Sequence, residues 1–152
     1  MTVSARLAEL GIELPAVAAP VAAYVPAVSH SGLVYTSGQL PFTDGALPAT
    51  GKVGAAVSAE DAKEYARTCA LNALAAAADV AGGVDRIAGV LRLGGFVASA
   101  PEFSGQPGVI NGASEVLGEI FGDSGRHARA AVGVAVLPLD SPVEVDVVFI
   151  LV

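Results

Sequence analysis

The sequence predicts an α+β fold, with one mixed β-sheet and two main helices packed on one of its faces. Two observations carry this prediction. β-rich runs occur near both ends of the chain, and two stretches between them repeat their apolar residues at helical spacing. The resulting order is β-β-(β)-α-β-α-β-β. With 152 residues and no internal repeat or linker, we expect one domain over residues 1–152.

The first half of the chain predicts a short helix, a hairpin and a long helix. Residues 4–12 fit the short helix, and two β-rich runs flank Ser31 and Gly32. The long helix is expected after an N-cap at Ser58 and before Gly82 and Gly83. Its small apolar stripe contains Ala62, Ala66, Cys69, Ala70, Ala73 and Ala77. Cys69 is therefore interpreted as a core residue rather than a nucleophile.

The second half predicts a strand over residues 87–97, a helix within 108–122, and two strands over 129–137 and 143–151 around the turn PLDSP. In strand 129–137, valines alternate with Ala131, Gly133 and Ala135. Small residues allow another backbone to approach closely, so this small-residue face is expected to contact a neighbouring subunit.

Composition also indicates a homo-oligomer. The chain is 53% hydrophobic and 15% charged. Its apolar stretches are interrupted by Asn72, Asp79, Gly and Pro well short of the roughly 20 residues that span a bilayer. We therefore expect other subunits, rather than a membrane, to cover the excess apolar surface. The net charge of −7 argues against binding a phosphate backbone. A single cysteine and no recognisable signal peptide fit a cytoplasmic protein, for which we expect no nucleic-acid or membrane partner.

The common cofactor and metal motifs are absent from the sequence. It has no GxGxxG after a strand, no P-loop, no CxxC and no HExxH. His30 and His127 are the two histidines, which makes a metal site improbable. Both are interpreted as surface or cap residues, and Arg126 likewise as peripheral.

Arg129 and Glu144 are the candidate functional residues. Each begins a predicted strand, and each can be read as a solvated strand end. Alternatively, the guanidinium of Arg129 binds a carboxylate. Glu144 shares a strand face with Asp146 and Val148, and its alternative role is to position a water or transfer a proton. If the chain reverses at PLDSP, the two residues lie roughly 25 Å apart. They would then meet only across a subunit boundary.

Three segments resemble the YjgF/RidA family of reactive intermediate deaminases, formerly called endoribonuclease L-PSP. They are YVPAV followed by LVYTSGQLP, FSGQPGVINGAS, and RHARAAVGVAVLPLDSPVEVDVV. The sequence around GRHARAAVGVA is similar to that of a divergent branch of the family. The resemblance implies a chorismate-mutase-like fold, a homotrimer with clefts between subunits, and hydrolysis of 2-imino acids to 2-oxo acids and ammonia. It implies no metal and no organic cofactor.

The resemblance also implies roles for individual residues. Arg129 matches the arginine that binds the substrate carboxylate, and Glu144 matches the acid that acts on the water. The other matching positions are Tyr24 in the cleft wall, Ser37 and Gly38 lining the pocket, and Asn111 in the cleft. Ala131 stands where the deaminases commonly carry cysteine, and the segment APEFSGQPG is an insertion near the expected cleft. A non-catalytic trimeric binder of small carboxylates is the alternative, and a ribonuclease is a third hypothesis that the acidic charge disfavours.

Overall fold

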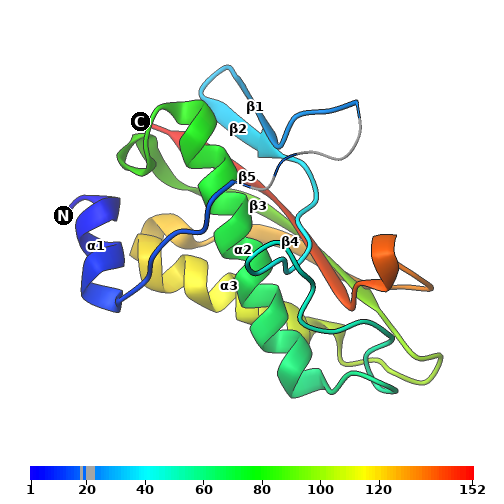
Figure 1. Cartoon of the computed structure of the whole chain (residues 1–152). Helices are drawn as coiled ribbons and strands as arrows, with labels where there is room; N and C mark the ends of the chain where they lie inside the picture. Colours follow the sequence, from blue (N-terminus) through cyan, green and yellow to red (C-terminus); the bar gives the residue numbers. More distant parts are fainter. Residues whose placement is uncertain (18, 20–22) are drawn as a thin grey trace.

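The computed structural model describes residues 1–17, 19 and 23–152 and contains three α-helices and five strands within them (Figure 1). In chain order the elements are α1 (Val3–Leu10), β1 (Ala27–His30), β2 (Leu33–Thr36), α2 (Ala59–Ala81), β3 (Ile87–Ala98), α3 (Gln106–Phe121), β4 (Ala128–Val134) and β5 (Val143–Leu151). The expected helices and hairpin are confirmed, and β4 ends three residues earlier than predicted.

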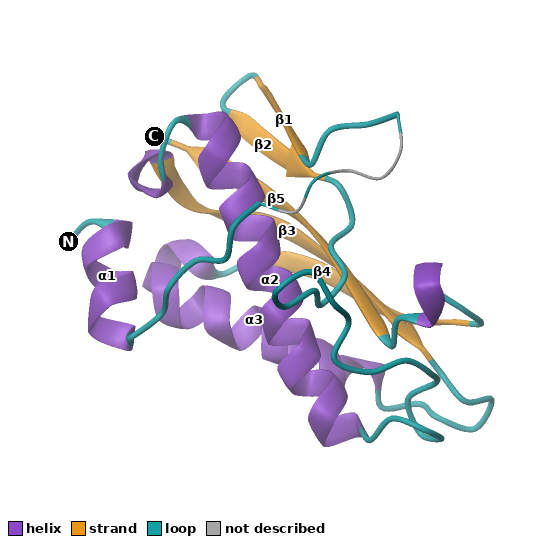
Figure 2. Ribbon diagram, viewed as in Figure 1, coloured by secondary structure: helices purple, strands orange, loops and turns teal. Residues whose placement is uncertain are grey.

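The strands form one mixed sheet in the order β1-β2-β5-β3-β4. β3 pairs with β4 in parallel and with β5 antiparallel, and the remaining pairs are antiparallel. Helices α2 and α3 lie on the same side of this sheet (Figure 2). The predicted α+β class is therefore confirmed, as is the packing of the two main helices on one face.

Local capping accounts for the boundaries of α2. The Ser58 side chain accepts a hydrogen bond from the backbone N–H of Asp61 at 3.1 Å, and Gly82 ends the helix with a φ of 85°. Helix α3 can approach α2 closely because Gly112 has no side chain. A Cβ at this position would overlap the carbonyl oxygen of Lys63. Cys69 is fully buried in this layer, as predicted, and burial raises the pKa of its thiol.

The two faces of the sheet are covered unequally. Val34, Phe149, Leu93 and Val147 point toward the helices and are buried. The opposite face carries Tyr35 at 47% exposure and Val132 at 44%, among other apolar side chains. We call this uncovered surface the open face. It carries the side chains Val28, Leu33, Tyr35, Phe96, Val132, Glu144, Asp146 and Val148.

One expectation for the C-terminal strands is wrong: β4 and β5 do not form a hairpin, because β3 lies between them. The small-residue face of β4 lies on the helix side, where Ala131 packs against the core and Gly133 lies against the Gln106 side chain. Its contact with a neighbouring subunit stays a prediction. It is the valine side of β4, with Val132, that belongs to the open face.

No helix in the described part of the chain is both long and apolar enough to cross a membrane.

Candidate functional site

Arg129 lies on the helix-facing side of β4 and is held against α3. Its Nη1–H group donates to Ser114 Oγ at 3.1 Å, and its Nη2–H group donates to the Pro107 carbonyl oxygen at 3.2 Å. A guanidinium has five N–H groups in a rigid fork. These two bonds orient the fork and use only part of its donor capacity.

A shallow pocket of about 400 Å³ opens beside Arg129. It is lined by Asn111, Ser114, Gly118, Gly122, Gly125, Arg126, His127 and Arg129. Among these described residues the only charged or titratable side chains are basic, although the whole protein has a net charge of −7. The pocket is therefore suited to an anion, and both Asn111 and Arg129 line it. We call it the Arg129 pocket.

Two further members of the Arg129 pocket were not predicted. Ser114 Oγ and His127 Nε2 lie 2.9 Å apart, and His127 Nδ1 lies 2.6 Å from the Gly125 carbonyl oxygen. The interpretation of His127 as peripheral is therefore wrong, whereas the Arg126 side chain is 86% exposed. No sequence pattern predicts this contact, because it depends on how the turn after the helix folds back toward Ser114.

Glu144 lies on the open face, at the start of β5, beside the segment that follows β2. Its carboxyl group lies directly over Gly38, where a Cβ would overlap Oε1. Partial burial raises the pKa of Glu144, and the nearby charge of Asp146 raises it further. Burial likewise raises the pKa of Asp146, while Arg92, with Nη1 3.9 Å from Oδ1, opposes that shift.

The other predicted residues near Glu144 belong to one connected segment. Ser37 Oγ–H donates to the Val25 carbonyl oxygen at 2.6 Å, which ties the end of β2 to the segment that carries Tyr24. Tyr24 is 48% exposed. Gln39, next to Gly38, exchanges backbone hydrogen bonds with Val145. Ser37, Gly38 and Glu144 thus form a second group, which we call the Glu144 group.

The Arg129 pocket and the Glu144 group do not meet within one chain. Arg129 is level with Leu93 of β3 and faces the helices, whereas Glu144 is level with Phe96 and faces the opposite side. Three residues along the strands and two strand spacings across the sheet separate their Cα atoms by roughly 14 Å. The expected 25 Å was too long because it assumed a β4–β5 hairpin. The inference that one subunit alone does not unite the pair still holds.

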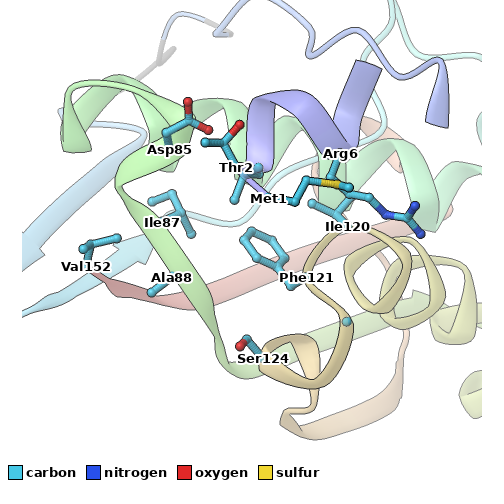
Figure 3. Close-up of a pocket in the computed structure, with 12 residues that line it drawn as sticks. Met1, Thr2, Arg6, Asp85, Ile87, Ala88, Ile120, Phe121, Ser124 and Val152 are labelled. Atoms are coloured by element: carbon cyan, nitrogen blue, oxygen red, sulfur yellow. The ribbon is translucent and has the colours of Figure 1, made fainter. Parts of the chain in front are cut away.

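Another pocket, of about 490 Å³, lies between the start of α1 and the sheet. In Figure 3 the side chains of Ile87, Ile120 and Phe121 gather near Met1 and Thr2. The Asp85 carboxylate accepts hydrogen bonds from the backbone N–H and the hydroxyl of Ser4, both at 2.7 Å. These contacts fasten α1 to the body, and the pocket includes none of the predicted site residues.

The fold defines a class of protein: a chorismate-mutase-like α+β domain, here with candidate functional groups on both faces of its sheet. Residues 4–151 match the family described as "YjgF/chorismate mutase-like, putative endoribonuclease". The chain therefore belongs to the YjgF family, also known as the L-PSP endoribonuclease family.

Individual relatives place the chain within a divergent branch of that family. It is 44% identical to Protein TCP17 of Trypanosoma cruzi over 145 residues, which cover 95% of this chain and 91% of that protein. The crystal structure of Atu1372 from Agrobacterium tumefaciens, a protein of unknown function, is also 44% identical, with a TM-score of 0.88 over 99% of this chain and 92% of that one. The YjgF gene product of E. coli is more distant, at 25% identity and a TM-score of 0.65 over 89% of this chain and 92% of that one.

Proposed function

We propose that this protein is a deaminase of small reactive 2-imino acids, acting in the cytoplasm at clefts between the subunits of a homotrimer. In the reaction, water adds to the C=N carbon of the substrate, and the resulting carbinolamine expels ammonia to leave a 2-oxo acid. The observation that carries the proposal is the oriented guanidinium of Arg129 in a pocket whose charged lining residues are basic. Such a fork binds a carboxylate through two parallel hydrogen bonds.

Glu144 supplies the second part of the proposed mechanism. An imine is already electrophilic, so catalysis requires mainly a held substrate and an oriented water. A carboxyl group with a raised pKa is suited to exchange a proton with that water. Because the two groups lie on opposite faces of the sheet, the Arg129 of one subunit would work with the Glu144 of another.

The open face supports the trimer. Its exposed apolar side chains include Val28 at 51%, Tyr35 at 47% and Val132 at 44%. Apolar surface of this kind is typical of a subunit interface. We propose that Tyr24, Ser37, Gly38 and Asn111 line the completed cleft, and that Ala131 gives it a smaller wall than the cysteine common in the deaminases.

The test is ammonia release from a panel of imines generated in place by an amino-acid oxidase. Arg129→Ala should lower kcat/KM by about 100-fold or more, since it removes charged hydrogen bonds of about 1.5–3 kcal/mol each. Glu144→Gln should lower kcat with less effect on binding. Arg67→Ala is the matched control, because Arg67 lies on α2 and pairs with Glu119 at 3.6 Å.

Full activity of Arg129→Ala would overturn the assigned role. Binding of 2-oxobutanoate by the wild type, without accelerated imine hydrolysis, would instead establish the non-catalytic carboxylate binder. Sedimentation equilibrium tests the trimer. Cleavage of RNA by the metal-free purified protein would favour the ribonuclease hypothesis, which the net charge of −7 disfavours.

A further inference from the structure

A chain of three hydrogen bonds runs through the Arg129 pocket. It begins at Arg129 Nη1–H, passes through Ser114 Oγ at 3.1 Å, continues to His127 Nε2 at 2.9 Å, and ends where His127 Nδ1 meets the Gly125 carbonyl oxygen at 2.6 Å. The four residues come from α3, from the turn that follows it, and from the start of β4. All four line the same pocket.

The carbonyl oxygen at the end of the chain determines the role of every group in it. A carbonyl only accepts, so His127 Nδ1 carries a proton and donates it to Gly125. In a neutral ring Nε2 then has no proton and accepts from the Ser114 hydroxyl. That leaves the lone pairs of Ser114 Oγ for the N–H of Arg129. With a neutral ring, each group is thus used as a donor or an acceptor in one consistent direction.

The end of the chain is held rigidly. Gly125 is buried, and a Cβ there would lie 2.7 Å from the Leu117 carbonyl oxygen, so the turn is pressed against α3. Ser114 projects from the same helix, and Arg129 also donates to the Pro107 carbonyl at its start. The guanidinium is consequently fixed at two points along α3, one of which depends on His127.

We propose that Ser114 and His127 are positioning residues that orient Arg129 for carboxylate binding. This inference rests on the proposed function of the Arg129 pocket. Without the Ser114 hydroxyl, the guanidinium keeps only its bond to Pro107 and rotates more freely. Carboxylate binding then has to fix this side chain, and affinity falls.

The first experiment measures binding of 2-oxobutanoate to the full chain by calorimetry. Ser114→Ala should weaken binding about fivefold to tenfold without lowering the thermal midpoint, because Ala favours a helix. Ser114→Thr keeps the hydroxyl and should restore most of the affinity. Thr68→Ala is the control: Thr68 is a hydroxyl on α2 that donates to the Glu64 carbonyl oxygen.

The second experiment reads the imidazole directly. Nitrogen-15 NMR of the ring distinguishes the two neutral tautomers, and His30→Gln assigns the remaining signal to His127. We expect the Nδ1–H tautomer in the wild type, and a changed Nε2 shift in Ser114→Ala. The Nε2–H tautomer, unchanged affinity in Ser114→Ala, or no 2-oxobutanoate binding by the wild type would each overturn the inference.

Neither measurement requires turnover, so the positioning role and the deaminase proposal can be tested separately. If the wild type binds 2-oxobutanoate but hydrolyses no imine, and Ser114→Ala binds it more weakly, the positioning role stands and the deaminase proposal falls. If the wild type hydrolyses imines and Ser114→Ala binds and reacts like it, the positioning role falls and the deaminase proposal stands.

Discussion

The two faces of the sheet hold the two candidate groups in different surroundings. On the helix side, Arg129 is half-buried and tied by hydrogen bonds to α3. On the open face, the Glu144 carboxyl group lies over Gly38, among apolar side chains that no helix or strand of residues 1–17 and 23–152 covers. The helix side is therefore packed within one chain, whereas the apolar side chains of the open face stay exposed. This difference predicts which substitutions should affect folding and which should affect assembly or activity.

The largest expected effect is on the helix side. Phe149→Ala should lower the free energy of unfolding by about 3–5 kcal/mol, because this fully buried ring leaves a cavity under α2 and α3. Ile150→Ala changes the next residue of the same strand, which points to the open face, and should cost less in the separated subunit. Urea unfolding at low protein concentration measures both, and equal losses would contradict the comparison.

Assembly should depend on the open face. Val132→Lys should weaken self-association by about 100-fold or more, since an unpaired charge in a buried interface costs several kcal/mol. Val80→Lys is the matched control, because Val80 on α2 is 41% exposed against 44% for Val132. Sedimentation equilibrium gives both association constants. A fully associated Val132→Lys protein would show that this face stays outside the interface.

Two glycines test the role of the carboxylate itself. Ala at Gly38 would displace the Glu144 carboxyl group, and we expect kcat/KM for imine hydrolysis to fall by about tenfold or more. Ala at Gly94 would instead crowd Asp146, whose Oδ1 would lie 2.5 Å from the new Cβ. It should therefore affect activity less. The reverse order would transfer the proposed role from Glu144 to Asp146.

The smallest expected effect is a shift in pH dependence. Asp146 raises the pKa of Glu144, so Asp146→Asn should lower that pKa. If Glu144 acts as a carboxylate, activity falls as it is protonated, and the acidic limb of the rate profile should move to lower pH. Asp79→Asn, on α2, should leave the limb in place. A limb unchanged by Asp146→Asn would mean that another group titrates there.

The sequence predicted those parts of the fold that local interactions determine. The Ser58 cap, the Gly82 end and the alternation in β5 are each visible in a few neighbouring residues. The position of β3 between β4 and β5 was not visible, because strand pairing depends on distant partners. PLDSP resembled a hairpin turn, yet Asp140 pairs with Lys52 and its carbonyl accepts from the Gly51 N–H. A distant loop holds this turn.

Prediction of the site had the same limit. Arg129 and Glu144 were named from the strand pattern, and Asn111 and Gly38 from the family resemblance. The structure places them as two pairs, Arg129 with Asn111 and Gly38 with Glu144. Ser114 and His127 lie within segments that resemble the family, but the resemblance assigned no role to either residue. They meet because α3 ends in a turn that folds back along it. Only the tertiary structure reveals such a contact.

The strand order also has a kinetic consequence. The β1–β2 hairpin is local, but it joins the rest of the sheet through β5, which is also the antiparallel partner of β3. The sheet therefore remains in two pieces until residues 143–151 enter between them. Closure of such distant pairs is slow compared with helix formation, so we expect folding on the scale of milliseconds to seconds, with entry of β5 as the committing step.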